Sequence, residues 1–218
     1  FNKKPPPEPP PEQPSPIEIL PFQPLPGFSS PHAQTVLAYL NPAGSSPPST
    51  TQLIPLNDGN SLCCEVSTPP SWRETEKTIL LIHGLGGSHT SSYMIRNSRK
   101  FYAAGMRAVR VNMRGSGSGL CLANKPYHGG LSSDILSVIT SFKQQTPLSP
   151  IILIGFSLGG NIALKLAGEL GSGAAELIKA TIAVCPPIDL AETAAILSQP
   201  ENRLYNRYYM KQLETITN

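Results

Sequence analysis

The chain has 218 residues, a formal net charge of +3 and a charged fraction of 14%. That length suits one domain with a hydrophobic core plus an appendage, and the scattered lysines and arginines form no stripe with aromatic residues, which argues against a nucleic-acid partner. No apolar run approaches the ~20 residues that would span a bilayer, so the sequence predicts no membrane span within these residues.

Prolines dominate the N-terminal segment. A polyproline run interrupted by Glu8 occupies residues 5–11, and such a run can neither form a helix nor pair within a sheet. Residues 1–20 are therefore predicted to be a disordered, solvated proline-rich segment, with recognition by an SH3-type domain as the alternative. The segment from Pro31 to Leu40 is predicted to contain a short helix.

Beyond residue 50 the pattern alternates between strands and helices. An antiparallel hairpin is expected where 52–56 and 62–66 flank an Asp-Gly turn. Short, almost wholly apolar runs predict buried strands at 78–82 and 151–154, and further strands are predicted at 108–112 and 180–184. Helical spacing predicts helices near 92–104, 132–144 and 158–170, and residues 191–218 form a tyrosine-rich helical stretch. This alternation predicts an α/β domain with a mainly parallel, doubly wound sheet, in which function gathers at the carboxyl ends of strands.

The four cysteines predict neither a disulfide framework nor a zinc site, because no C-x-x-C pair is present. Cys185 lies in an apolar run and is predicted to be buried as a small hydrophobic side chain. This usage suits a reducing compartment, so a cytoplasmic location is favoured. Because the first residue is Phe1 and not Met, an upstream targeting or anchor segment stays open.

The run Gly155-Phe156-Ser157-Leu158-Gly159 matches the pattern G-x-S-x-G and stands between a predicted strand and a predicted helix. A serine at such a sharp turn has strained backbone angles, and small residues on either side prevent crowding. The turn lifts the hydroxyl above the sheet edge and aims the Leu158 amide at a developing oxyanion. Ser157 is therefore the predicted nucleophile, and a plain glycine-rich turn is the alternative.

A second glycine-rich loop, His83-Gly84-Leu85-Gly86-Gly87, ends an earlier buried strand. The loop at this place supplies a second oxyanion amide in hydrolases with such a serine motif, and Leu85 is the expected donor, with Gly86 as the less favoured one. A phosphate-binding loop is excluded because no G-x-x-x-x-G-K-[ST] pattern is present. His83 is expected to order the loop by hydrogen bonding, with a catalytic role as the alternative.

The sequence predicts structural roles for four further polar residues. Arg114 is predicted to hold the turn after the strand at 108–112, and His128 to lie in a loop. Asp134 is predicted to cap or pair near a helix start. Asp189 is expected to cap a helix, with the role of catalytic acid as its alternative.

The sequence shows no catalytic base for Ser157 at the usual place in the chain. All four histidines, at positions 32, 83, 89 and 128, precede Ser157, whereas the usual chain order is serine, acid, histidine. A serine hydroxyl is a poor nucleophile without a base. The catalytic acid and histidine are therefore expected outside this chain, and the fragment alone is predicted to be inactive. No metal and no organic cofactor is implied.

Several spaced motifs together carry a resemblance to a known family. They are 31–35 (PHAQT), 83–88 (HGLGGS), 112–115 (NMRG), 127–130 (YHGG), 155–161 (GFSLGGN) and 187–190 (PIDL). In this order they resemble the YheT-like branch of the α/β-hydrolase superfamily (AB-hydrolase family 4), which includes bacterial esterases, mammalian phospholipase-like members and yeast medium-chain ethyl ester synthases. The resemblance implies an α/β-hydrolase fold with a Ser-Asp-His triad whose nucleophile is Ser157.

The resemblance also implies where the hydrolase core and the cap lie, whereas the proline-rich start is not part of the family pattern. Residues 1–20 are the proline-rich segment, 21–190 the N-terminal part of the hydrolase core, and 191–218 the start of a cap, so the chain would end before the cap is complete and before the last strands. The triad acid and histidine would follow, and Asp189 would match a position that is not the triad acid.

The expected function is a serine carboxylic ester hydrolase acting on lipid-like or short- to medium-chain acyl esters through an acyl-enzyme on Ser157. The expected partner is a small-molecule or lipid ester substrate. Two alternatives stay open. One is acyl transfer, in which an alcohol replaces water, and the other is a non-catalytic α/β-hydrolase scaffold that binds a partner protein.

Overall fold

A computed structural model describes residues 21–40 and 42–217, so the predicted proline-rich segment 1–20 lies outside the described residues. The chain divides into two units, residues 1–40 and 41–218. In the first unit, the predicted short helix is present as α1 (Pro31–Leu40). Pro31 occupies its first position, where a missing N–H costs nothing, and the Ser30 carbonyl accepts the Gln34 N–H at 3.1 Å.

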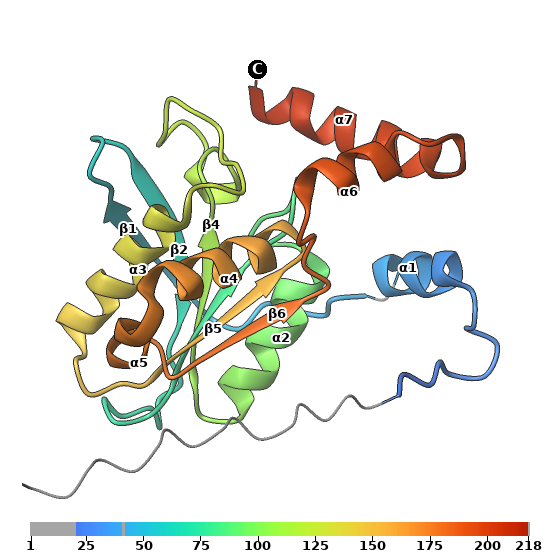
Figure 1. Cartoon of the computed structure of the whole chain (residues 1–218). Coiled ribbons are helices and arrows are strands. Elements are labelled where there is room, and N and C mark those ends of the chain that lie inside the picture. The colour runs from blue at the N-terminus through green and yellow to red at the C-terminus, as the bar shows by residue number, and fades with distance from the viewer. Residues whose placement is uncertain (1–20, 41, 218) are drawn as a thin grey trace, which may run out of the picture. The chain divides into compact units, whose positions relative to one another are not determined.

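A six-stranded mixed sheet is the centre of the second unit (Figure 1). Its strands are β1 (Thr50–Pro55), β2 (Ser61–Ser67), β3 (Thr78–Ile82), β4 (Arg107–Asn112), β5 (Ile151–Phe156) and β6 (Ala180–Val184), in the order β1-β2-β4-β3-β5-β6. Strands β1 and β2 form the predicted antiparallel hairpin, and β2 also pairs antiparallel with β4. The other pairings are parallel, which confirms the mainly parallel sheet.

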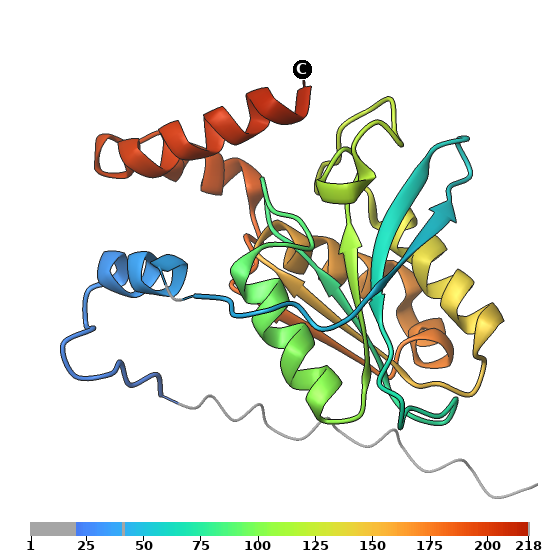
Figure 2. The same ribbon diagram turned by 180° about the vertical axis from the view of Figure 1, so that it is seen from behind.

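Helices cover both faces of this sheet. They are α2 (Ser92–Ala103), α3 (Ser132–Gln145), α4 (Leu158–Leu170) and the short α5 (Ala174–Leu177), with 3-10 turns at Gly117–Gly119 and Gly171–Gly173. Figure 1 shows α3 and α4 in front of the sheet, and Figure 2 shows α2 on the opposite face. The prediction of a doubly wound architecture is therefore confirmed.

The central strand β3 explains why its sequence is almost wholly apolar. Leu80 and Ile82 join the larger core cluster, which includes residues of α3 and α4. Ile79 and Leu81 point the other way and pack in a second cluster with Met94 of α2. Because side chains alternate across a strand and both faces are covered, every position of β3 must be apolar or hydrogen-bonded.

The tyrosine-rich stretch after β6 forms two helices. They are α6 (Leu190–Leu197) and α7 (Arg203–Thr217), with a 3-10 turn at Pro200–Asn202 between them. Proline lacks the N–H that a continuing helix needs, so the break falls at Pro200. Both views place α6 and α7 beyond the carboxyl ends of the parallel strands. Among the described residues, no helix combines the length and apolarity required to cross a bilayer.

The prediction that Cys185 is buried is wrong. Cys185 is exposed, with a positive φ of 48°, directly after β6. Within the described part of the chain, no strand pairs with the outer edge of β6, and Ile182 in the same strand is 47% exposed. The apolar run around Cys185 favoured its burial, but burial at the end of β6 depends on neighbours that the described residues do not supply.

Candidate active site

Ser157 occupies the single position between β5 and α4. Its backbone has φ 50° and ψ −121°, in a region that residues with a side chain rarely adopt. Its amide N–H donates to the Val184 carbonyl of the neighbouring strand at 2.9 Å. Ser157 is therefore the single residue that connects β5 to α4, and the backbone strain of this turn is concentrated at the serine.

The glycines two residues before and after Ser157 are required by contact with backbone. A Cβ added to Gly155 would overlap the carbonyl oxygen of Gly159. A Cβ added to Gly159 would lie 2.5 Å from the carbonyl oxygen of His83, well inside van der Waals contact. The spacing of the motif thus follows from the close approach of α4 to β5 and of α4 to the end of β3.

The loop after β3 lies directly against the serine. A Cβ added to Gly84 would lie 3.1 Å from the Cβ of Ser157. The loop thus starts beside the serine and carries Leu85 and Gly86 at the same sheet edge, as the sequence predicts for the carboxyl ends of neighbouring parallel strands. Gly86 has a φ of 68°, and a Cβ there would meet the side chain of Gln212 in α7 at 2.7 Å.

Two tyrosines to which the sequence analysis assigned no role hold this loop. The Gly84 N–H donates to the Tyr93 hydroxyl at 2.9 Å. The Gly86 N–H donates to the Tyr127 hydroxyl at 2.7 Å. These two amides flank Leu85 and are both occupied. The tyrosines lie in α2 and in the segment between β4 and α3, so no local motif in the sequence indicates the contacts.

The remaining loop amides also have acceptors. The Gly87 N–H donates to the Gly84 carbonyl at 3.1 Å, and the Ser88 N–H donates to the Ser91 hydroxyl at 3.0 Å. In the part of the chain that the structure describes, the Leu85 N–H has no hydrogen-bond acceptor. It is the one amide from residues 84 to 88 in this condition.

The start of α4 presents a second such amide. Leu158 is the first residue of the helix, and its N–H has no acceptor within the described residues. The first turn of a helix leaves its N–H groups unpaired, and they carry the positive end of the helix dipole. The backbone thus brings two unpaired donors, from Leu85 and Leu158, to the same strand ends as the Ser157 hydroxyl.

His83 is fully buried and both of its ring nitrogens are engaged. Nδ1–H donates to the Gly84 carbonyl at 2.7 Å, and Nε2 accepts the Met113 N–H at 3.1 Å. Burial disfavours the charged ring and lowers the pKa of His83 from 6.5 to about 4. The expectation that His83 orders its loop is confirmed, and no lone pair is left with which the ring could act as a base.

The depressed pKa of His83 predicts a dependence of stability on pH. The unfolded chain binds a proton at His83 below about pH 6.5, whereas the folded protein does so only below about pH 4. Stability is therefore fully present above pH 6.5 and falls as the pH drops towards 4. Wild type should lose on the order of 2–3 kcal/mol between pH 7 and 4.5 through this group.

Urea unfolding of the full-length protein at both pH values measures this loss. His83→Gln should remove most of that pH-dependent component, whatever its stability at pH 7. His128→Gln is the matched control, since the His128 side chain is exposed and the one hydrogen bond of its ring among the described residues is with the Gly130 N–H. Parallel pH curves for wild type and His83→Gln would refute the assignment.

Arg114 joins its own segment after β4 to the start of α3 and to the turn between β1 and β2. Its Nε and one terminal nitrogen donate to both carboxylate oxygens of Asp134 at 2.6 and 2.7 Å, and its other terminal nitrogen donates to Asp58 at 2.6 Å. The Arg114 hydrogen bond lowers the pKa of Asp58 to about 2. The predicted structural roles of Arg114 and of Asp134, as a pairing residue near a helix start, are confirmed.

Two other expected structural residues lie where the sequence predicts. Asp189 caps α6, because its carboxylate accepts the Glu192 N–H at 2.9 Å. His128 lies in the loop before α3. His89 contacts the Asn112 side chain at 3.0 Å through its Nδ1. Within the described residues, no side chain hydrogen-bonds the Ser157 hydroxyl.

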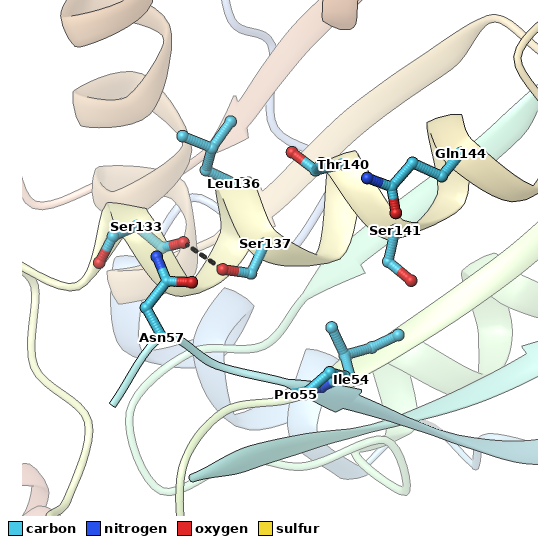
Figure 3. Close-up of a pocket in the computed structure, with 9 residues that line it drawn as sticks. All are labelled: Ile54, Pro55, Asn57, Ser133, Leu136, Ser137, Thr140, Ser141 and Gln144. Carbon is cyan, nitrogen blue, oxygen red and sulfur yellow. Dashed lines mark hydrogen bonds between the residues drawn. The ribbon is translucent and has the colours of Figure 1, made fainter. Parts of the chain in front are cut away.

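A separate cavity of about 350 Å³ lies between the β1 end of the hairpin and α3 (Figure 3). It is lined by neutral side chains only: Ile54, Pro55, Asn57, Ser133, Leu136, Ser137, Thr140, Ser141 and Gln144. None of the residues of the serine site contributes to it. The described residues also contain no group of three or more His, Cys, Asp or Glu side chains able to hold a metal ion.

Comparison with known proteins shows which proteins this chain is similar to in sequence and fold. A family model described as "alpha/beta hydrolase fold" matches residues 77–213. YheT of Escherichia coli (strain K12) is 25% identical over 193 residues, which are 88% of this chain and 56% of YheT. Human Phospholipase ABHD3 is 29% identical over 154 residues, 71% of this chain and 36% of that protein.

Among solved structures, XC6422 from Xanthomonas campestris, described as an a/b serine hydrolase without lid, matches with a TM-score of 0.53 and 27% identity. The match covers 67% of this chain and 65% of that chain. These comparisons confirm the family resemblance indicated by the six spaced motifs. This chain spans about half of YheT and about a third of ABHD3.

Proposed function

The chain belongs to the alpha/beta hydrolase fold family, and on that premise we propose that it carries the nucleophile and the oxyanion site of a serine carboxylic ester hydrolase. The single observation that supports this most is the strained Ser157, which stands between β5 and α4 at the strand ends where two backbone amides have no acceptor among the described residues. A plain structural turn has no use for strain at a residue with a side chain, or for unpaired donors beside it.

The reaction would proceed in two steps. The Ser157 hydroxyl attacks the ester carbonyl carbon as a base takes its proton, and the Leu85 and Leu158 N–H groups stabilise the negative oxygen. The tetrahedral intermediate collapses, the C–O bond to the alcohol breaks, and the base returns its proton to the leaving alcohol. Water then attacks the acyl-Ser157 ester in the same way and releases the carboxylic acid.

The base of this reaction is proposed to come from residues outside this chain. His83 has both ring nitrogens bonded, and the described contacts of His89 and His128 are with Asn112 and Gly130. Asp189 is engaged as a helix cap. A triad histidine and acid supplied by further residues would complete the site, and residues 1–218 alone would not hydrolyse esters.

The proposed substrates are lipid-like or short- to medium-chain acyl esters. The similarity to a protein named a phospholipase supports a lipid-like ester. The contact of Gln212 with the loop at Gly86 supports α7 as the start of a cap over the site. Acyl transfer to an alcohol is the close variant, and ester formation in the presence of ethanol would distinguish it from hydrolysis.

Fluorophosphonate labelling tests the proposal directly, because this probe reacts with an activated serine. The full-length protein should be labelled at Ser157, as located by peptide mass spectrometry, and residues 1–218 alone should stay unlabelled under the same conditions. A folded full-length protein without label would favour the alternative of a non-catalytic scaffold. Labelling of the 1–218 chain would show that the base lies within it.

A further inference from the structure

The loop that follows β3 has an unusual distribution of hydrogen bonds. The Gly84 and Gly86 N–H groups donate to the hydroxyls of Tyr93 and Tyr127, while the Leu85 N–H between them has no acceptor in the described residues. Buried amides are normally paired, and a loop can pair them with its own carbonyls or with water. Here the amides on either side of the unpaired one donate to two side chains outside the loop, one from the following helix α2 and one from the segment after β4.

Tyr127 is anchored independently of the bond that it makes. Its side chain is buried, with 8% of its surface exposed, and its ring packs edge-on against the ring of His83 at 5.7 Å between centroids. His83 in turn accepts the Met113 N–H at the end of β4. The hydroxyl that receives the Gly86 N–H is therefore held from the core and does not follow the loop.

Tyr93 connects the loop to the nucleophile turn. Its ring packs on Phe156 with 4.8 Å between centroids, and Phe156 immediately precedes Ser157. Its hydroxyl accepts the Gly84 N–H. One side chain of α2 thus contacts both the strand that ends in the serine and the loop that carries the Leu85 amide.

Burial raises the pKa of both tyrosines, so their hydroxyls stay protonated and neutral throughout the physiological range. A neutral hydroxyl can accept an N–H without placing a negative charge beside the site. A carboxylate in the same place would oppose the negative oxygen that forms during ester cleavage.

From this geometry, and resting on the proposed function, we propose that Tyr93 and Tyr127 are the positioning residues of the oxyanion site. They fix the peptide units that carry the Gly84 and Gly86 N–H groups, on either side of the unit that carries the Leu85 N–H, so that the Leu85 N–H alone points to the reacting carbonyl. Through its packing on Phe156, Tyr93 also fixes the position of the Leu85 N–H relative to Ser157. Neither tyrosine touches the substrate; both act through the orientation of the Leu85 amide.

The test replaces each tyrosine by phenylalanine in the full-length protein, which removes only the hydroxyl and keeps the ring packing. Loss of an oxyanion donor costs about 10²–10³ in kcat, and a misdirected donor costs less, so each variant should lose roughly 10- to 50-fold in kcat. KM should stay within about twofold, because the amide acts mainly in the transition state. Tyr102→Phe in the same helix α2 is the matched control.

A second readout isolates the oxyanion site from general stability. Sulfur is a weak hydrogen-bond acceptor, so a thionoester gains less than the matching oxoester from the Leu85 N–H. The ratio of oxoester to thionoester rates should therefore fall at least threefold, as an order-of-magnitude expectation, in Tyr93→Phe and Tyr127→Phe. It should stay at the wild-type value in Tyr102→Phe.

The outcomes distinguish a failure of the positioning role from a failure of the proposed function. A lower melting temperature with unchanged kcat and an unchanged rate ratio in the folded variants would overturn the positioning role. A variant that fails to fold is replaced by the other tyrosine, since either one tests the same amide. If wild type neither hydrolyses esters nor labels at Ser157, the proposed function itself has failed.

Discussion

Ser157→Ala is expected to lower kcat/KM for ester hydrolysis by the full-length protein by roughly 10⁴- to 10⁶-fold, the range seen when a serine nucleophile is removed. The hydroxyl is the only group at the strand-to-helix turn able to form the acyl-enzyme. The two amides at Leu85 and Leu158 remain in the variant and would account for its residual activity.

The control for this loss is a serine of similar exposure far from the site. Ser137→Ala in α3 removes a hydroxyl that bonds only the Ser133 carbonyl of its own helix, so activity should stay at the wild-type level. Both variants should keep the wild-type melting temperature within a few degrees, since neither hydroxyl is buried in a network. Hydrolysis that survives Ser157→Ala with less than a tenfold loss would exclude the nucleophile assignment.

Arg114→Met is expected to lower the free energy of unfolding by about 3–5 kcal/mol, the usual cost of removing one partner from a buried ion pair. The Arg114 and Asp134 side chains are only 6% and 8% exposed, and the substitution leaves the Asp134 carboxylate buried without its two strongest donors. The loss should be measured by urea unfolding at pH 7.

Lys165→Met provides the comparison. Lys165 pairs with Glu169 on the surface of α4, where the two side chains are 38% and 51% exposed, so its removal should cost no more than about 1 kcal/mol. The double variant Arg114→Met with Asp134→Leu should recover much of the loss, because the cost comes from the unpaired charge. An Arg114→Met variant as stable as Lys165→Met would show that the buried pair contributes little.

Several structural features follow from short-range sequence information. The strand β3 has the bounds predicted from its apolar run. Both faces of this central strand are covered, so every buried position along it favours an apolar residue. The turn at Ser157 was predicted from five residues. Its two glycines are required because any side chain there would collide with the backbone of the adjoining helix and strand. The cap at Asp189 is likewise a local interaction.

Other features depended on neighbours distant in the chain. Cys185 was predicted to be buried from its apolar surroundings, but it is exposed beside the outer edge of β6. The tyrosine-rich stretch 191–218 was predicted as one helical segment, although Pro200 could have indicated the break between α6 and α7.

The amino-acid sequence by itself determined the order of strands and helices, the strained serine turn and the placement of Leu85 and Leu158 at neighbouring strand ends. These depend on periodicity and on glycine spacing, which are local properties. Only the tertiary structure decided which loop amide stays unpaired, because Tyr93 and Tyr127 reach Gly84 and Gly86 across 9 and 41 positions of the chain. The bond from Gly86 to Tyr127 leaves no local pattern in the sequence, because it exists only once the sheet has brought the ends of β3 and β4 together.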